Sequence, residues 1–488
     1  MATLGNTRQL RQRPIHKKIC PNVRSILQGQ PKSRSKPKWK LLPPDIFIRI
    51  FSFVSPSDRC NLRIVNSTFK GIIDHPTNWT SKSIRLCNVQ RYDDNAWQLI
   101  ETRNLRCIEL GKLSKKNFKK FSKKINCLRK LRVMGPMKVS HLQSLQCQKE
   151  WLREFTIRDS SLLSDTELIQ GITHFKQLTK LELGNINSLR NESLKGLVKL
   201  KNLQSLTLCK ANTPYQYGFQ ITGSGLQYVL FRLPNLRSLT LFAVNGMDFS
   251  LSTVFTSPYE NPGLEENDNE VDLGNSPEGE VCEDKPLTQL NLETLNLPFS
   301  LNFPLSDLAL KQLETVTNLS LHESYLLRRR DLSKHDVMRI FKRLKTVKKL
   351  DLSSSNCQNE VLANLPSTVE WLDLRDCYSV SILGIHSLAE VVGPKLKYLG
   401  LALCNRLSAP LISSFSRLFP NLEELDLSCC RAVTTAHFKV FLQLKRLRIL
   451  RLVGCPQITE DSIQKAREES QNRILITGPY YIYKKDKR

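Results

Sequence analysis

One sequence motif recurs through the C-terminal half of this chain and constrains its fold more than any other feature. Leu422, Leu425 and Leu427 have the spacing L-x-x-L-x-L, and Cys430 follows three residues after the last leucine. The motif is repeated 25 residues later at residues 447–455. Two leucines two residues apart face the same side of a strand, whereas the preceding connector has apolar residues at helical spacing. Each repeat is therefore predicted to be one strand and one helix that share an apolar seam.

A repeat of this kind buries its seam only by stacking against its neighbours. After a first irregular strand near Ile84 and Leu86, the sequence contains thirteen strand signatures. They start at Leu105, Leu128, Leu152, Leu178, Leu203, Leu236, Leu292, Val316, Val347, Val369, Leu396, Leu422 and Leu447. Most starts are 22 to 27 residues apart, which leaves room for a helix in each connector. We therefore predict an α/β leucine-rich-repeat solenoid over residues 86–476, an arc with a parallel inner sheet and outer helices.

Three segments are predicted to lie outside this array. Residues 1–40 carry eleven Lys or Arg and no acid and are broken by prolines, which predicts a disordered basic tail. Two basic clusters in it are consistent with a split nuclear import signal, a solvated tail or a transit peptide. Residues 257–286 hold ten acids against one Lys, which predicts a disordered acidic insert, either a spacer or a docking segment. Ile474–Ile476 are expected to cap the last repeat before a tail at 477–488.

The segment from Leu41 to Val54 is predicted to be a helix that is apolar on most sides. Pro43 and Pro44 open it, and Asp45 lies in its favourable first turn. Two short helical segments follow, at 57–66 and 67–73. About forty residues are too few to bury so much apolar surface unaided, so the solenoid, a partner or both are expected to cover it.

The residues of this segment resemble a known motif. The positions that match an F-box, over residues 41–85, are Leu42, Pro43, Asp45, Ile46, Ile50, Phe51, Leu62, Val65, Phe69, Asp74, Pro76 and Trp79. Phe69 stands where that motif usually has Trp, Asn66 where it usually has Cys, and Asp45 where Glu is common. An F-box before cysteine-containing leucine-rich repeats is similar to the F-box and leucine-rich-repeat family. Members of that family are substrate receptors of cullin-based (SCF) ubiquitin ligases.

The resemblance implies an adaptor-binding face. Its residues would bind the Skp adaptor, which bridges to the cullin, and they are Leu42, Pro43, Ile46, Ile50, Phe51, Leu62 and Val65. The alternative is that they only pack a local three-helix core, and it applies most to Phe51, Leu62 and Phe69. A helix that is apolar on so many sides favours the interface for Leu42, Pro43 and Ile46.

The strand positions that flank the last two leucines are expected to face the open inner surface. These positions carry seven acids and seven bases, so the surface is predicted to be neutral although the whole chain has a formal net charge of +28. The excess positive charge must lie on connectors and tails, and a mixed-sign surface argues against a continuous nucleic-acid groove. Trp371 and Tyr398 lie on adjacent predicted strands. With nearby charges they form a candidate site for a protein substrate, comprising Asp351, Trp371, Asp373, Arg375, Tyr398, Glu424 and Asp426. The alternative is that Trp371 packs against its neighbours.

Motifs for catalysis or metal binding are missing. The sequence has no C-x-x-C, P-loop or H-E-x-x-H, so we predict no catalytic residues, no metal site and no cofactor. Cysteines three residues after strand leucines predict a buried row, as expected in a reducing cytoplasmic or nuclear compartment. The best apolar run is interrupted by Asp45 and Arg49, so no membrane span is predicted.

Three functional hypotheses follow. The first is a non-catalytic ligase receptor, whose partners would be the Skp adaptor, the cullin and an unidentified protein substrate. The second is a basic leucine-rich-repeat scaffold that binds nucleic acid or an anionic membrane surface through its connectors and tail. The third is an adaptor-binding protein whose bound partner is not ubiquitinated.

Overall fold

A computed structural model describes most of the chain. The described residues are 42–65, 67–86, 89–112, 114–125, 127–185, 189–209, 221–242, 250–260, 285–297, 305–322, 334–355 and 357–478. The predicted basic tail, most of the acidic insert and nearly all of the C-terminal tail lie outside these residues. The chain divides into two compact units, Met1–Ile73 and Asp74–Arg488, and each is described by itself.

The first unit contains three helices, α1 (Pro44–Ser52), α2 (Pro56–Arg63) and α3 (Ser67–Asp74). The sequence starts them as expected: Asp45 lies in the first turn of α1, and the Ser55 side chain accepts a hydrogen bond from the Asp58 N–H (3.1 Å) before α2. Three aromatic rings form the centre of the unit, with centroids 5.5 to 5.9 Å apart: Phe47, Phe51 and Phe69. Phe69, which stands in place of the usual Trp, completes this core.

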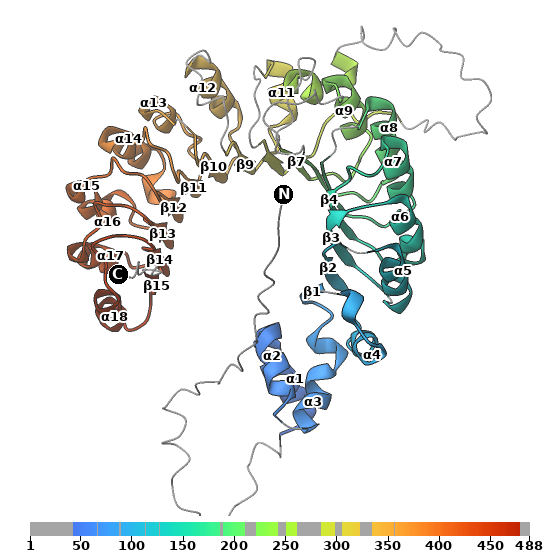
Figure 1. The fold of residues 1–488 in the computed structure, drawn as a ribbon. Coiled ribbons are helices and arrows are strands. Elements are labelled where there is room, and N and C mark those ends of the chain that lie inside the picture. The colour runs from blue at the N-terminus through green and yellow to red at the C-terminus, as the bar shows by residue number, and fades with distance from the viewer. Residues whose placement is uncertain are drawn as a thin grey trace, which may run out of the picture. The chain divides into compact units, whose positions relative to one another are not determined.

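The second unit is an array of strands and helices. In the described part of the chain, fifteen strands form one parallel sheet in sequence order. They are β1 (Ser83–Leu86), β2 (Cys107–Leu110), β3 (Lys130–Pro136), β4 (Glu154–Asp159), β5 (Lys180–Gly184), β6 (Ser205–Cys209), β7 (Ser238–Phe242), β8 (Thr294–Asn296), β9 (Asn318–Ser320), β10 (Lys349–Asp351), β11 (Trp371–Asp373), β12 (Tyr398–Gly400), β13 (Glu424–Asp426), β14 (Ile449–Arg451) and β15 (Leu475–Thr477). Within this unit the strands line the inner side and the helices lie outside them (Figure 1).

Helices fill the connectors between the strands. They are α4 (Asp94–Thr102), α5 (Lys115–Lys124), α6 (Val139–Leu145), α7 (Asp165–Thr173), α8 (Asn191–Lys195), α9 (Gly223–Leu230), α10 (Leu251–Phe255), α11 (Asp307–Gln312), α12 (Lys334–Arg343), α13 (Asn359–Leu362), α14 (Ile382–Val392), α15 (Ala409–Ser413), α16 (Phe415–Leu418), α17 (Phe438–Gln443) and α18 (Glu460–Glu469). Many begin after a side-chain cap; for example, the Ser306 hydroxyl accepts from the Ala309 N–H at 3.1 Å. None of the described helices is long and apolar enough to cross a membrane.

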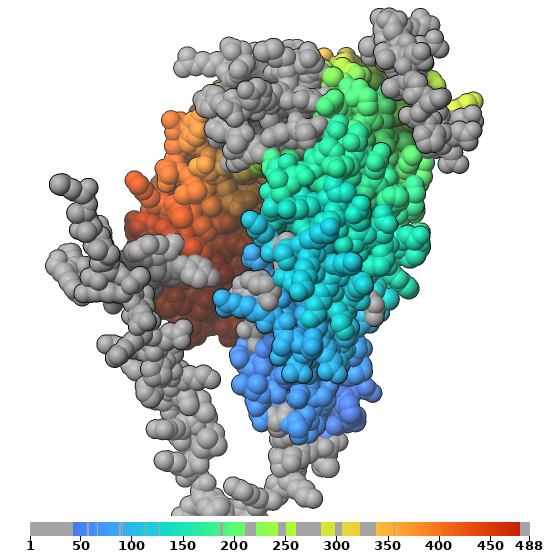
Figure 2. Space-filling model, turned by 45° about the vertical axis from the view of Figure 1, so that its right-hand side comes forward, coloured from blue at the N-terminus to red at the C-terminus, as the bar shows by residue number. Residues whose placement is uncertain are grey.

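The sequence prediction of fold class is confirmed. Each of the thirteen predicted signatures starts two residues before an observed strand, from β2 to β14. The irregular strand near Ile84 is β1, and the segment expected to cap the array forms β15. The register aligns the inward leucines: Leu372 lies opposite Leu399, which in turn lies opposite Leu425. Successive repeats therefore bury one continuous core, and the space-filling view shows them following one another along the unit (Figure 2).

The predicted row of buried cysteines is present, and every described cysteine is free. Each thiol of the row donates a hydrogen bond to a leucine carbonyl of the preceding repeat, at 3.1 to 3.2 Å. The donors are Cys377, Cys404, Cys430 and Cys455, and the acceptors are Leu352, Leu374, Leu401 and Leu427. Burial raises the pKa of Cys430 to about 12 and that of Cys455 to about 11. The row therefore links repeats without disulfides.

The segment from Asp74 onward packs on the solenoid. Arg103, which follows α4, pairs with Asp74 at 2.8 Å, and its guanidinium lies 4.0 Å from the centre of the Trp79 ring. Asp74 and Trp79 are buried. The division between the compact units thus comes before the predicted F-box boundary at residue 85, because these contacts attach the end of the motif to the first repeats.

Candidate interaction surfaces

Helix α1 carries two apolar stripes on adjacent sides of the helix, about 100° apart. Phe47 and Phe51 are four residues apart and point into the aromatic core of the first unit. Ile46 and Ile50 are also four residues apart but remain largely exposed. Side chains four residues apart share one face of a helix, so the two stripes come from the same spacing with a one-residue offset.

The exposed stripe is part of a larger apolar surface on the first unit, called the apolar face below. Its members and their exposed fractions are Leu42 (41%), Ile46 (44%), Ile50 (46%), Phe53 (84%), Ile64 (77%) and Val65 (63%). So many exposed apolar side chains on so small a unit are typical of a protein-binding site. Arg59 helps to set its geometry, because its guanidinium donates to the Ser52 carbonyl (2.9 Å) and ties α2 to the last turn of α1.

Most residues predicted to bind the adaptor are accessible. Leu42, Pro43, Ile46, Ile50 and Val65 are exposed, and Leu62 is half-buried. Phe51 is a correction: the sequence placed it with the binding face, but it is only 5% exposed because its ring packs edge-on against Phe69. The prediction missed Phe53 and Ile64. Phe53 follows Ile46 by seven residues, so helical spacing from Ile46 and Ile50 was a signal that could have found it.

The inner surface of the solenoid brings Trp371 and Tyr398 together as predicted. The two residues lie directly opposite each other on β11 and β12, and their rings stack with centroids 4.3 Å apart and planes at 9°. Trp371 stays half-buried, whereas Tyr398 is buried. The expectation that Tyr398 faces open solvent is therefore wrong, because the indole covers it.

Asp373 is also buried, contrary to the expected open position. Its carboxylate accepts hydrogen bonds from the Arg375 backbone N–H (3.0 Å) and from the Arg375 Nε (2.7 and 2.9 Å). Burial raises the pKa of Asp373 even beside this cation. Gly400, opposite Asp373, makes the arrangement possible: a Cβ there would lie 2.6 Å from Asp373 Oδ1 and 2.8 Å from the Tyr398 hydroxyl.

The aspartates at the ends of these strands stabilise the turns that follow them. Each accepts a hydrogen bond from the backbone N–H two residues later. Asp351 accepts from Ser353, Asp373 from Arg375 and Asp426 from Ser428, each at 3.0 Å. A side chain that bonds the backbone two residues on stabilises a turn. Asp426 is buried in this role, so its predicted exposure is wrong, whereas Asp351 and Glu424 are half-buried and Arg375 is exposed.

Charges on the inner surface pair across neighbouring strands. Glu424 pairs with Arg451 at 3.1 Å, and other cross-strand pairs lie farther toward the N-terminus, at 2.8 to 3.7 Å: Glu154 with Lys130, Glu182 with Arg158, and Glu109 with both Arg85 and Arg132. Opposite charges on adjacent strands satisfy each other at this spacing. The prediction of a neutral surface thus has a geometric basis, and such a surface offers no continuous track for a phosphate backbone.

One cluster on the inner surface contains the residue types of a hydrolase site. The Ser353 hydroxyl lies 2.6 Å from Asp351 Oδ1 and 2.7 Å from His322 Nδ1. The serine lies between the acid and the histidine, whereas nucleophilic catalysis requires a base between them, and Ser353 is buried. Among the described residues, no group of three or more His, Cys, Asp or Glu side chains is placed to hold a metal ion.

Comparisons with known proteins assign the first unit. Residues 39–85 match the family model described as F-box-like, which covers the whole apolar face. None of the curated proteins matches the chain. Among solved structures, the complex of Rad7 and Elc1 in yeast matches with a TM-score of 0.47 and 15% sequence identity, over 87% of this chain and 92% of that chain. The family match shows an F-box-like domain at residues 39–85, and the described sheet and helices form the parallel strand–helix solenoid that follows it in the sequence.

Proposed function

We propose that this chain is the substrate-recognition subunit of an SCF-type ubiquitin ligase. The F-box-like domain would bind a Skp adaptor, which bridges to the cullin, and the inner surface of the solenoid would hold a protein substrate. The observation that carries the proposal is the apolar face on the domain that matches the F-box-like family. Burying such a face against a partner is favourable at about 25 cal/mol per Å².

The proposed mechanism is proximity without chemistry in this chain. Holding a substrate near the catalytic subunits makes transfer effectively intramolecular, which raises its rate without any catalytic group on the receptor. The inner surface supports this role with the half-buried indole of Trp371, which rests on the buried Tyr398 ring, and with the exposed guanidinium of Arg375. Tryptophan, tyrosine and arginine contribute most often to binding hot spots.

Co-purification tests the adaptor step. The tagged chain is expected to recover a Skp adaptor and cullin, and Ile46→Ser with Ile50→Ser is expected to abolish that recovery. Leu162→Ser with Leu383→Ser is the matched control, because these leucines are exposed (54% and 72%) in the second unit. Unchanged recovery with the first pair contradicts the proposal. Recovery of an elongin-type adaptor in place of Skp keeps the receptor role but changes the ligase class.

The same experiment separates the scaffold hypothesis from the receptor hypothesis. Helix α5 has six lysines, of which Lys120 and Lys124 pair with Asp94 (3.2 Å) and Glu101 (3.1 Å). Association with RNA or anionic vesicles that falls with salt and ignores the α1 substitutions would favour the scaffold. Proximity labelling with intact and substituted α1 then identifies substrates, since only true substrates accumulate when adaptor binding is lost.

A further inference from the structure

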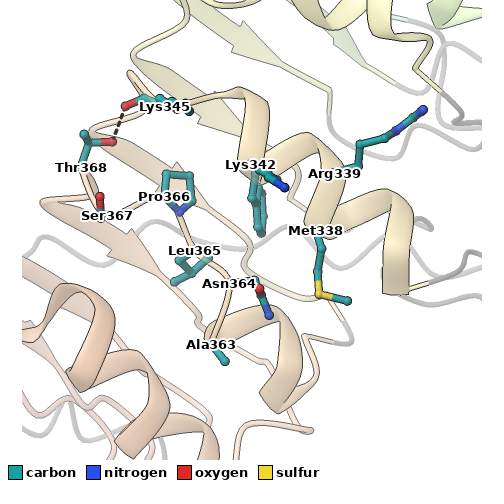
Figure 3. A pocket seen from close by; sticks show the side chains of 11 residues that line it. Met338, Arg339, Lys342, Lys345, Ala363, Asn364, Leu365, Pro366, Ser367 and Thr368 are labelled. Atoms are coloured by element: carbon teal, nitrogen blue, oxygen red, sulfur yellow. Dashed lines mark hydrogen bonds between the residues drawn. The ribbon is translucent and has the colours of Figure 1, made fainter.

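A groove opens on the helix side of the solenoid, between α12 and the turn that follows α13. Helix α12 spans ten residues, whereas α13 spans four. Because α13 is so short, it leaves one flank of α12 uncovered, and residues 363–368 form the opposite wall. The resulting cavity of about 770 Å³ is called the α12–α13 groove below (Figure 3).

The floor of the groove is apolar. Phe341, Leu365 and Pro366 are buried beneath it, and Met338 is half-buried at its edge. The wall is held in place by Thr368, whose hydroxyl donates to the carbonyls of Lys345 (3.0 Å) and Val347 (2.7 Å). The groove is thus a formed feature with a fixed wall.

The rim of the groove is positive. Lys342 and Lys345 are exposed on it, and neither forms an ion pair with another described residue. Arg339 points away from Leu365 and Pro366, toward the Leu305 carbonyl and Asp307 (3.7 Å). The residues that line the groove include no Asp or Glu. Lys342 and Lys345 also border a neighbouring hollow, where Asp307 and Glu314 pair with Arg339 and Arg343. An occupant therefore meets two available ammonium groups above an apolar floor.

We propose that the α12–α13 groove is a docking site for an acidic peptide segment of a protein partner. Carboxylates of the segment pair with Lys342 and Lys345, and an apolar side chain between them packs on Met338 and Pro366. Charge complementarity selects this occupant. The groove is on the helix side of the second unit, so its residues belong neither to the inner surface proposed for substrate nor to the F-box-like domain.

Other anionic occupants fit the groove less well. Arginine forks hold phosphate bidentately, whereas the available cations here are two lysines, which attract an anion only as point charges. Single-stranded nucleic acid binds on exposed aromatic rings, whereas the aromatic ring here, Phe341, is 2% exposed. A peptide with spaced carboxylates and one apolar anchor matches both the floor and the rim.

Fluorescence anisotropy with the full chain tests the proposal. The probe is a labelled peptide of Glu and Asp residues around a central Leu-Phe pair. Two control peptides replace either the acids by Gln and Asn or the Leu-Phe pair by serines. The first peptide is expected to bind most tightly, the serine-substituted peptide measurably but more weakly, and the uncharged peptide not at all. Added salt is expected to weaken binding of both charged peptides because salt screens exposed pairs. Equal binding of the uncharged peptide overturns the proposal.

A matched pair of charge reversals locates the binding. Lys342→Glu with Lys345→Glu is expected to weaken binding about tenfold or more, because two attractions become repulsions. Lys439→Glu with Lys465→Glu makes the same change in net charge at another hollow on the helix side, of about 270 Å³, and is expected to leave binding unchanged. An equal loss in both variants means that net charge alone attracts the peptide, which overturns the proposal.

Two further measurements test the apolar anchor and the identity of the occupant. Met338→Gln is expected to weaken binding of the Leu-Phe peptide but to leave binding of the serine-substituted peptide unchanged, because only the apolar anchor contacts Met338. If the probe binds only after the nine acids of residues 261–284 become Gln or Asn, the occupant is this chain's own acidic segment and the proposal is overturned. Adaptor recovery is expected to be normal in the Lys342 and Lys345 variant, so the two proposals fail independently.

Discussion

Neighbouring residues on α1 offer a sharp test of which side of the helix binds the adaptor. Ile50 is 46% exposed and Phe51 is 5% exposed, although they are adjacent in sequence. Fully burying an isoleucine side chain contributes about 1.5 to 3 kcal/mol, so covering the exposed part of Ile50 contributes about 1 kcal/mol. Phe53 is 84% exposed, and covering it contributes about 2 kcal/mol.

These values convert into an expected order of adaptor affinities. Ile50→Ser is expected to raise Kd about fivefold and Phe53→Ser about thirtyfold. Phe51→Leu is expected to leave Kd unchanged but to lower the stability of the first unit by about 1 kcal/mol, because it disturbs the packing against Phe69.

Calorimetric titration of the full chain with the adaptor measures Kd, and hydrogen exchange of residues 44–74 measures local stability. Val65→Ser, two residues after α2, extends the test to the rest of the apolar face. The reasoning is refuted if Phe51→Leu raises the Kd for the adaptor more than Ile50→Ser does while hydrogen exchange is unchanged. The buried stripe would then be the contact surface.

Three further predictions concern the solenoid. Gly400→Ala is expected to lower the free energy of unfolding by about 1 to 3 kcal/mol, because the new Cβ would lie 2.6 Å from Asp373 Oδ1; Gly111→Ala, with no atom within 4 Å of its Cβ, is the control in urea unfolding. Iodoacetamide near neutral pH is expected to modify exposed Cys60 and Cys147 but to spare Cys377 and Cys455, because burial raises the pKa of both to about 11; peptide mass mapping checks this, and equal labelling contradicts it. Burial also raises the pKa of Asp373, so the stability linked to this carboxyl is present below its unfolded-state pKa and is lost as pH rises through the folded-state pKa. Asp373→Asn is therefore expected to gain stability relative to the unsubstituted chain across that window in urea unfolding at a series of pH values, and a difference independent of pH would argue against it.

The strand positions could be predicted from sequence because one leucine motif determines both where a strand starts and which of its side chains face the core. Leu372, Leu399 and Leu425 are fully buried in matching register, as that motif requires. The three-helix unit was predictable for a different reason: its prolines and serine caps mark where helices begin. Both signals are local, so neither depends on knowing the tertiary contacts.

Exposure on the inner surface was less predictable, because alternation along a strand says which side a residue faces but not what covers it. Asp373 and Tyr398 lie on the inner-surface side of their strands as expected. However, Trp371 on the neighbouring strand lies over Tyr398, and Gly400 leaves the space that Asp373 fills. Such coverage depends on residue sizes at the same register in adjacent repeats. On α1 the difficulty was similar, since Phe51 and Ile50 are both apolar and only the ring of Phe69 decides which of them is buried.

The α12–α13 groove shows how irregular spacing carries information that a regular repeat does not. The strand signatures that start at Val316, Val347 and Val369 are 31 and 22 residues apart, so a long connector is followed by a short one. In a stacked array each helix is covered by the helix of the next repeat. The long α12 beside the short α13 leaves a flank open, and Lys342 and Lys345 of the long connector lie on that flank. Uneven connectors thus locate a gap on the helix side, and the charge of the longer connector selects the sign of the partner.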